Sequence, residues 1–325
     1  MALIKCRHYQ EPKICGWDQL LECEKRHRSD PDAKDKETEW IFKGHKEKNW
    51  RLRTTLEREI GNIGINTKDL HEDSKNRADY EDKYDNELKD ILRKGLFGQS
   101  VDKIEAGLLR KFQRQFHHHD LRVPGNDDVT EWLALMRHYG APVRLLDWTY
   151  SFYVAVFFAI EEAEGDCAVW ALDKKVIINR VLGRCGEDSV LPWYQKECLS
   201  RDIDVIKSRT WETVFSQSAT PFVFPLNPLR LNERLVIQQG DFLCPGNIRN
   251  TFEDNLAEVL PSAQNGSDYK LFKYVVRFDV KARKEILQNL HRMNINRATL
   301  FPGLDGFAQS LKTLLVSPKN LLKDF

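Results

Sequence analysis

The segment 144–159 constrains the fold of this chain more than any other, because polar residues stand directly before a wholly apolar run. It reads Arg-Leu-Leu-Asp-Trp-Thr-Tyr-Ser and then Phe-Tyr-Val-Ala-Val-Phe-Phe-Ala. The two leucines predict a short strand that ends at Asp147, and the apolar run predicts a helix over 151–164 that is buried on every side. A core of this kind would hold the backbone between the strand and the helix rigidly.

The polar residues between this strand and this helix are therefore candidates for a binding site, because such sites are usually built on short turns fixed by a rigid scaffold. They are Asp147, Trp148, Thr149 and Ser151. A structural role explains the same residues without a ligand, since Asp147 or Ser151 can cap the helix and Arg144 can pair with Asp147. The sequence of this segment leaves both explanations open.

A second segment places a cation on a strand. The stretch Glu-Trp-Ile-Phe-Lys-Gly-His from residue 39 alternates as a strand does, which puts Lys43 on the face opposite its neighbours Phe42 and Gly44. A basic loop, 46–58, follows this strand. The loop contains two candidates for a second cation, Arg51 and Arg53.

Periodicity and capping signals predict the remaining elements. We expect helices at 16–27, 102–117, 129–139, 281–292 and 305–316, and strands at 167–172, 234–238, 241–244 and 273–280. The helix over 129–139 should begin with Asp128 as its N-cap. This succession of helices and strands predicts an α+β fold, a mixed twisted sheet flanked by helices.

Composition excludes several classes of protein. The chain has 325 residues with 41% hydrophobic content, which is enough for one sizeable core. Its 50 basic and 49 acidic residues leave a net charge of +1, so no global field recruits nucleic acid or anionic lipid. The longest apolar run, 152–160, is too short to span a bilayer, and the N-terminus has no apolar signal segment. We expect a cytoplasmic protein with no membrane partner.

Cysteines and histidines indicate no metal site. Seven cysteines, an odd number without paired spacing, indicate free thiols in a reducing compartment. The N-terminal group lacks a Cys-x-x-Cys pair, so buried thiols explain it better than zinc; its members are Cys6, His8, Cys15, Cys23 and His27. The three adjacent histidines 117–119 cannot all face one ion from a helix end. No Walker, Gly-x-Gly-x-x-Gly, His-Glu-x-x-His or Gly-x-Ser-x-Gly motif occurs.

Four ordered blocks span the chain from residue 40 to residue 306. They read Trp-Ile-Phe-Lys-Gly-His at 40–45, Arg-His-Tyr-Gly-Ala-Pro-Val-Arg-Leu-Leu-Asp-Trp-Thr at 137–149, Arg-Leu-Val-Ile-Gln-Gln-Gly-Asp-Phe at 234–242 and Leu-Phe-Pro-Gly-Leu-Asp-Gly at 300–306. Together they resemble the FRG domain family. In the Phe-Arg-Gly motif that names the family, Lys43 replaces the arginine. His45 replaces the glutamine that often follows, and 142–144 reads Pro-Val-Arg instead of Pro-Thr-Arg.

The resemblance implies a domain plan and a broad biological class. The FRG-like domain would cover 39–316, with a polar insertion at about 61–90. A helical lead-in, 1–38, would precede it, and a C-terminal tail, 317–325, would follow. Domains of this family imply a bacterial or phage-borne soluble protein of the toxin or antiviral defence type.

The order of the blocks also resembles the ADP-ribosyltransferase fold. There a cation on the first strand binds the pyrophosphate of NAD, and Lys43 takes that position. A polar turn shapes the nicotinamide pocket, and 147–149 takes its place. A glutamate on a third strand stabilises the transition state; Glu233 stands nearest to it, out of register unless a bulge at 232–233 turns it toward the site. Otherwise one of three residues would have to replace it: Gln238, Gln239 or Asp147.

These considerations define the candidate site. The candidate catalytic residues are Lys43, Asp147, Glu233 and Gln238. The candidate NAD-binding residues are Lys43, His45, His138, Arg144, Trp148 and Thr149. Trp148 can stack on a nicotinamide or adenine ring, or it can fill the core. His138 can act as an acid–base group beside Asp147, or as an ordinary polar residue at a helix end.

Two functions of different class follow. The first is NAD-dependent ADP-ribosyl transfer, a glycosyltransferase reaction, or NAD cleavage by a toxin or defence effector, with NAD as the substrate and no metal. The second is a non-catalytic FRG module that senses a nucleotide, a nucleic acid or a protein such as an antitoxin or a phage protein. Only the basic loop 46–58 with Trp50 supports nucleic acid. A metal nuclease would need clustered carboxylates, and Asp202 with Asp204 is the nearest approach.

Overall fold

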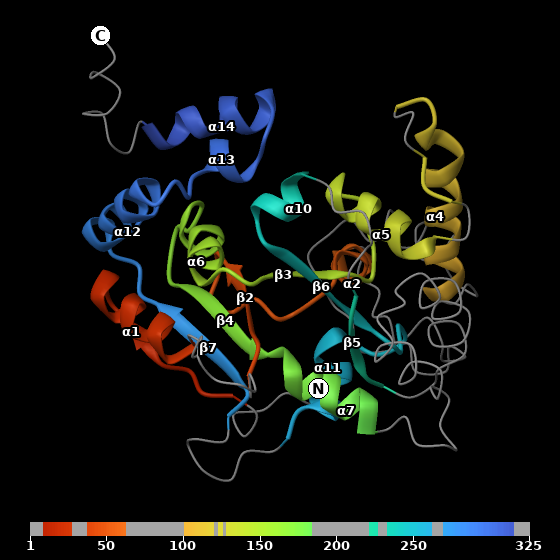
Figure 1. The fold of residues 1–325 in the computed structure, drawn as a ribbon, viewed down its shortest axis with the longest axis horizontal. Helices are drawn as coiled ribbons and strands as arrows, with labels where there is room; N and C mark the ends of the chain where they lie inside the picture. Colours follow the sequence, from red (N-terminus) through yellow and green to blue (C-terminus); the bar gives the residue numbers. More distant parts are fainter. Residues whose placement is uncertain are drawn as a thin grey trace, which may run out of the picture.

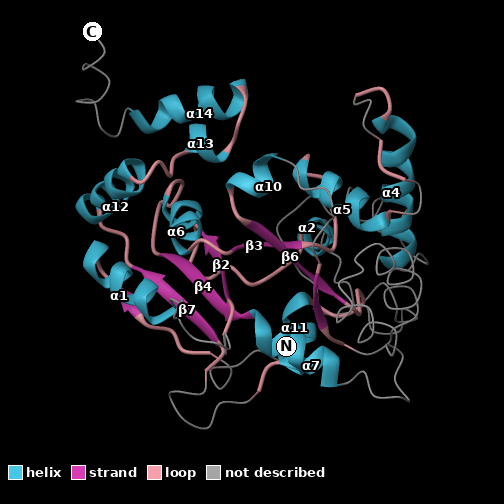
Figure 2. Cartoon of the chain, in the orientation of Figure 1, coloured by secondary structure: helices cyan, strands magenta, loops and turns pink. Residues whose placement is uncertain are grey.

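The computed structural model describes residues 9–27, 38–62, 101–119, 123–125, 128–183, 221–226, 233–261 and 269–314. Within these ranges the chain forms a mixed seven-stranded sheet flanked by helices (Figure 2). The strands pair antiparallel except for the first and last in sequence, which pair in parallel. The predicted α+β fold class is therefore confirmed.

The strands are short and follow an order that differs from their order in sequence. They are β1 (Lys13–Ile14), β2 (Trp40–His45), β3 (Leu146–Thr149), β4 (Cys167–Asp173), β5 (Val223–Pro225), β6 (Gly240–Pro245) and β7 (Leu271–Val276). Their order in the sheet is β1-β7-β4-β2-β3-β6-β5. The centre of the sheet therefore contains β2 and β3, the strands that carry Lys43 and Asp147.

The helices begin and end close to the predicted bounds where the sequence showed a clear apolar stripe. They are α1 (Trp17–His27), α2 (Thr55–Asn62), α4 (Val101–Phe116), α5 (Val129–His138), α6 (Phe152–Ile160), α7 (Lys174–Gly183), α10 (Glu233–Ile237), α11 (Phe252–Val259), α12 (Val280–Arg292), α13 (Arg297–Leu300) and α14 (Leu304–Leu314). Asp128 caps α5 as predicted, and Ser151 caps α6 by accepting a hydrogen bond from the backbone N–H of Val154.

Three strand predictions are wrong, each for a local reason. The strand expected at 234–238 is the helix α10, because the chain folds back through Gln239, whose φ is 47°, and lays Leu235 directly against Gly240. The strand expected to stop at Asp147 continues to Thr149 and pairs with β6. The strand expected over 273–280 stops at Val276, because Asp279 caps α12.

The sheet separates two hydrophobic cores, because successive residues of a strand point to opposite faces. Ile41 belongs to one core and Phe42 to the other. The first core packs against α4, α5, α7 and α11, and the second against α1, α6 and α12. The predicted helical lead-in is thus part of the fold, since α1 packs in the second core and β1 pairs with β7.

The helix α6 is buried almost completely and lies very close to β2. Seven of its nine residues are buried. A Cβ atom on Gly44 would lie 2.1 Å from the carbonyl oxygen of Ala155 and 2.6 Å from the backbone nitrogen of Ala159. Only glycine allows this approach, which explains why a glycine follows Lys43. The prediction of a buried helix after the polar residues is confirmed.

The sheet is divided in its middle (Figure 1). The strand β2 pairs with β4 through six residue pairs, and β3 pairs with β6 through four. Between β2 and β3, both fully described, one pair forms, Phe42 with Thr149. The strands β1, β7, β4 and β2 thus form one half-sheet, and β3, β6 and β5 form the other. We call the place where β2 and β3 diverge the sheet division.

No helix in the described part of the chain combines the length and the apolar character that crossing a bilayer requires.

Candidate functional site

Lys43, Asp147 and Arg137 meet at the sheet division. The Nζ atom of Lys43 donates a hydrogen bond of 3.1 Å to Oδ2 of Asp147 and one of 3.0 Å to its main-chain oxygen. The guanidinium of Arg137 donates from Nε, at 3.0 Å, and from Nη2, at 2.6 Å, to Oδ1 of the same carboxylate. Each carboxylate oxygen of Asp147 therefore contacts one cation. The structure brings together Lys43 and Asp147, which are 104 residues apart in sequence.

The local fold explains this convergence. Because β2 and β3 share one pair, the side chain of Lys43 can cross from one half-sheet to the other. Arg137 reaches the same point from the last turn of α5, after which Gly140, with φ of 81°, turns the chain back toward β3. The Lys43 side chain is 12% exposed and that of Asp147 is 43% exposed. The carboxylate is thus the more accessible partner.

Electrostatics keeps the carboxylate ionised. Burial opposes the charge of Asp147, but the positive charges of Arg137 and Lys43 outweigh it and hold its pKa well below the ordinary value. Burial lowers the pKa of Lys43, Asp147 opposes this effect, and the charges of Arg137 and Arg58 add to it. Asp147 is therefore an anion at neutral pH. A group with so low a pKa is poorly suited to general acid or base catalysis there.

Arg234, in the first turn of α10, adds a third cation to the site. Burial lowers its pKa, the charge of Arg137 lowers it further, and that of Asp147 raises it, so Arg234 lies within electrostatic reach of both. Its guanidinium carbon lies 4.2 Å from the centre of the Phe301 ring. Among the described residues, none forms a hydrogen bond or an ion pair with this guanidinium. Two cations thus bind the Asp147 carboxylate directly, and Arg234 is a third within electrostatic reach.

His138 borders the same group of charges. Burial lowers the pKa of His138, and the charge of Arg234 lowers it further. Its imidazole is therefore neutral at physiological pH, with capacity both to accept and to donate a hydrogen bond. Its role as an acid–base group stays a prediction.

Arg144 lies away from the sheet division. Its guanidinium forms a buried ion pair with Glu105 of α4, with a distance of 2.7 Å from Nε to Oε2, and the two side chains are 2% and 1% exposed. The alternative in which Arg144 pairs with Asp147 does not hold, because Arg137 takes that position. Arg144 instead connects the approach to β3 with α4. Its assignment as an NAD-binding residue stays a prediction.

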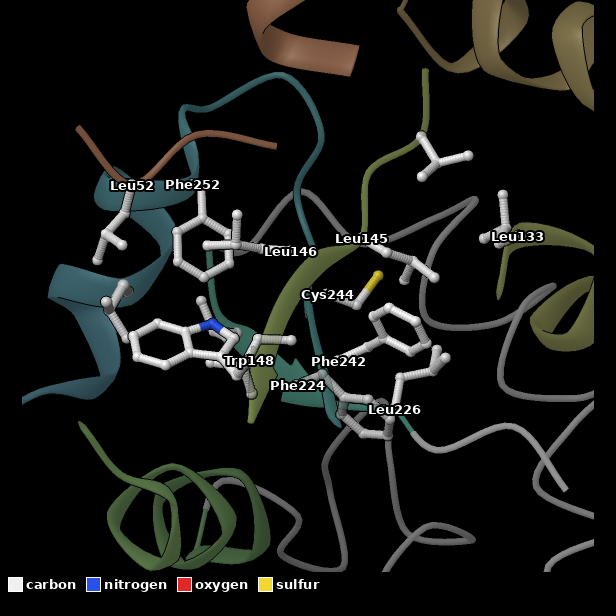
Figure 3. Close-up of a cluster of buried hydrophobic side chains, with 14 of the residues drawn as sticks. Leu52, Leu133, Leu145, Leu146, Trp148, Phe224, Leu226, Phe242, Cys244 and Phe252 are labelled. Carbon is white, nitrogen blue, oxygen red and sulfur yellow. The ribbon is translucent and has the colours of Figure 1, made fainter. Parts of the chain in front are cut away.

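His45 and Trp148 lie in the interior. The Nδ1 atom of His45 accepts a hydrogen bond of 3.3 Å from Nε1 of Trp170, and burial lowers the pKa of His45 to about 3. Trp148 is 3% exposed and packs in the first core among residues of β6, β5 and α11 (Figure 3). Of the two explanations for Trp148, filling the core is the one that the structure supports. Neither ring is available to stack on a ligand.

Thr149 and Gln238 hold the turn beside the site. The hydroxyl of Thr149 donates to the main-chain oxygen of Gln238 at 2.6 Å and accepts from the backbone N–H of Ser151 at 3.0 Å. The side-chain amide of Gln238 donates to the main-chain oxygen of Leu300 at 2.9 Å. These bonds join β3, α10 and α13. They give both residues structural roles, and a direct role in chemistry stays a prediction.

Glu233, the candidate for the third-strand glutamate, occupies a different element from the one predicted. It is exposed in the first turn of α10 rather than on a strand. A bulge at 232–233 in a strand therefore does not describe its position, although residue 232 itself lies outside the described residues. Its neighbour Arg234 lies within electrostatic reach of Arg137 and Asp147. The catalytic role of Glu233 stays a prediction.

Sequence reasoning missed Arg137 and Arg234 as site residues. Both begin blocks that were recognised as family-like, so a signal for them was present in the sequence. The two candidates from the basic loop, Arg51 and Arg53, pair instead with Glu253 and Glu57 at 3.0 and 3.7 Å. Arg51 thus joins the loop before α2 to α11, and Arg53 pairs with a residue of α2 itself. The second cation of the site therefore comes from the distant helix α5 and not from the loop that follows Lys43 in sequence.

The described residues contain no group of three or more His, Cys, Asp or Glu side chains that could hold a metal ion. His27 instead shares a hydrogen bond of 2.6 Å with the hydroxyl of Tyr274, and Cys23 is half-buried in α1. Two residues of the N-terminal cysteine and histidine group, Cys6 and His8, lie outside the described residues. So do Asp202 and Asp204.

A family of known domains matches the part of the chain that contains most of the site. Residues 38–167 match the family model of the FRG domain. The matched segment contains Lys43, Arg137 and Asp147, and it confirms the resemblance for the first two sequence blocks, 40–45 and 137–149. The blocks at 234–242 and 300–306 lie outside the matched segment. No curated protein and no solved structure shows significant similarity to the chain.

Proposed function

We propose that this FRG domain binds the phosphate groups of a nucleotide at the sheet division. The observation that carries the proposal is the guanidinium of Arg234, which has no anionic partner among the described residues and lies within electrostatic reach of Arg137 and Asp147. A guanidinium that is partly removed from water and lacks a counter-ion favours an added anion. Phosphate groups have the geometry to accept the parallel donors of an arginine fork.

NAD is the first nucleotide to test. The order of the sequence blocks resembles that of NAD-using transferases, and Lys43 stands where such proteins carry a pyrophosphate-binding cation. Three cations of the site fit the charge of a pyrophosphate: Lys43, Arg137 and Arg234. Binding without turnover is the simplest function of this geometry, since the one described carboxylate at the site is already paired with two cations. The domain would then act as a nucleotide sensor in a defence or toxin system.

ADP-ribosyl transfer or NAD cleavage is the second candidate. The observation that favours it is that Asp147 is ionised, fixed by two cations and still 43% exposed. A fixed carboxylate beside a bound ribose is the kind of group that stabilises an oxocarbenium-like transition state as nicotinamide leaves. The acceptor of the ADP-ribosyl group would be water in cleavage and a nucleophile of a target molecule in transfer.

Titration calorimetry of the full chain with NAD, ADP-ribose and nicotinamide riboside tests the proposal. We expect the first two to bind and the riboside, which lacks a pyrophosphate, to bind much more weakly. Arg234→Gln should weaken NAD binding by about tenfold or more, because it removes a charge-assisted hydrogen bond. Arg292→Gln, an exposed arginine on α12, is the matched control and should leave the affinity unchanged.

Two results would decide against the proposal. One is the absence of binding by every phosphate-bearing nucleotide tested, and the other is equal affinity in the wild type and in Arg234→Gln. Nicotinamide release, measured in the same samples with and without a bacterial lysate, separates the two candidates. Binding without release leaves the sensor, and release that Asp147→Asn abolishes supports the enzyme.

A further inference from the structure

We infer that Asp147 is an internal competitor of the ligand, an intramolecular anion that occupies the phosphate-binding cations until a more highly charged group displaces it. The inference rests on the proposed function and adds a regulatory element to it. Its basis is the pattern of contacts around one carboxylate, from Lys43 on one side and Arg137 on the other.

The carboxylate is bound as the edge of a phosphate would be. Oδ1 accepts two N–H groups of the Arg137 guanidinium, at 3.0 and 2.6 Å, and Oδ2 accepts the Lys43 ammonium at 3.1 Å. Arginine forks bind carboxylates and phosphates through the same planar arrangement of two donors. A phosphate that approaches these donors therefore finds them occupied by the Asp147 carboxylate.

Lys43 does not depend on the carboxylate for its placement. Its ammonium also donates a hydrogen bond of 3.0 Å to the main-chain oxygen of Asp147, which no side-chain replacement removes. The Lys43 side chain is 12% exposed, so its surroundings restrict it further. The cation would remain at the sheet division after the carboxylate has moved.

Asp147 can give up its contacts at modest cost. Its side chain is 43% exposed, so a displaced carboxylate can be solvated instead of remaining buried and unpaired. The displaced charge would still lie close to the ligand and repel it. Repulsion by the displaced carboxylate grows with the charge of the ligand, but the attraction by the two cations grows faster, because two positive charges act against one negative charge. The site should therefore select groups of charge two or more, such as a pyrophosphate, over a simple carboxylate.

If Asp147 competes with the ligand, Asp147→Asn should strengthen the binding of pyrophosphate. The amide oxygen can still accept hydrogen bonds from Arg137, but the competing negative charge is gone. We expect Asp147→Asn to bind inorganic pyrophosphate at least about tenfold more tightly than the wild type, which corresponds to about 1.4 kcal/mol. A residue that merely held the site together would give the opposite sign, a weaker complex.

The test is titration calorimetry of the full chain with inorganic pyrophosphate, and with acetate for comparison. Asp18→Asn makes the same change in charge on an exposed residue of α1 and should leave the affinity unchanged. If the wild type binds pyrophosphate and Asp147→Asn binds it equally or more weakly, the inference is overturned and the proposed function stands. If neither protein binds pyrophosphate, the inference is overturned as well, and the nucleotide titrations described above decide whether the proposed function stands.

A second measurement keeps the inference testable if Asp147→Asn does not fold. A crystal structure of the wild-type protein with pyrophosphate should show the ligand on Lys43 and Arg137 and the Asp147 carboxylate more than about 4 Å from Lys43 Nζ, beyond hydrogen-bond distance. A ligand bound at these cations while Asp147 keeps its present contact of 3.1 Å would overturn the inference.

Discussion

Replacing Gly44 by alanine should destabilise the protein strongly, although it adds only one methyl group. The new Cβ atom would lie 2.1 Å from the Ala155 oxygen, 2.6 Å from the Ala159 nitrogen and 3.0 Å from the Phe158 carbonyl carbon. All three atoms belong to the backbone of α6, so no side chain can rotate away. The helix itself must move from β2, and seven of its nine residues are buried. Overpacking of a core costs about 1–3 kcal/mol, and a rigid backbone neighbour places this site at the upper end or beyond.

Thermal unfolding of the purified full chain, followed by circular dichroism, measures the effect. A loss of about 3 kcal/mol should lower the melting temperature by roughly 5–10 °C. Gly107→Ala is the matched control, because Gly107 is exposed within α4 and a Cβ atom there meets nothing within 4 Å. That substitution should stabilise the protein by about 0.5–1 kcal/mol, since alanine favours a helix. Equal melting temperatures for wild type and Gly44→Ala would refute the close packing of α6 on β2.

Two further substitutions separate structural groups from the site. Glu105→Ala should cost about 3–5 kcal/mol of stability, because it leaves the buried Arg144 charge without its carboxylate, and the refolded variant should keep the NAD affinity of the wild type in titration calorimetry. Glu57→Gln should alter the pH dependence of urea unfolding, because burial raises the pKa of Glu57 to about 7. Between about pH 5 and pH 7 the folded wild type binds more protons than the unfolded chain, so its free energy of unfolding falls as the pH rises. The Glu57→Gln variant should lack this fall. A loss of NAD affinity in Glu105→Ala, or parallel pH profiles in the second comparison, would contradict these assignments.

The sequence predicted the parts of the site that belong to strongly patterned segments. Lys43 lies on a strand with clear alternation, and Asp147 stands before a wholly apolar helix, so both could be placed at the edge of a core. Their contact could be inferred from the order of family-like blocks. Arg137 could not be chosen over Arg144, because the choice depends on how the chain turns at Gly140 between α5 and β3. Periodicity contains no information about the direction in which a chain leaves a turn.

The misassignment of α10 has a different cause. The run Leu-Val-Ile after Arg234 has the composition of a strand, and local propensity favours that assignment. The chain instead forms one short helix, because Leu235 must pack on Gly240 at the start of β6. The buried ion pair of Arg144 and Glu105 could not be predicted either. The two residues are 39 positions apart, and the sequence around one of them gives no indication of the other. Contacts that depend on tertiary packing leave little trace in a single sequence.

The division of the sheet has a consequence for association with other chains. A sheet normally has two edges. Here β2 and β3 share only the pair of Phe42 with Thr149, so each strand also has an inner edge whose other backbone groups do not pair with the neighbouring strand. Unpaired edges invite foreign strands, and natural proteins protect them with charged side chains, lysine above all, that point across the edge. Lys43 and Asp147 stand on these two inner edges. The ion pair therefore places two charged side chains at these inner edges, where they disfavour pairing with a strand of another molecule.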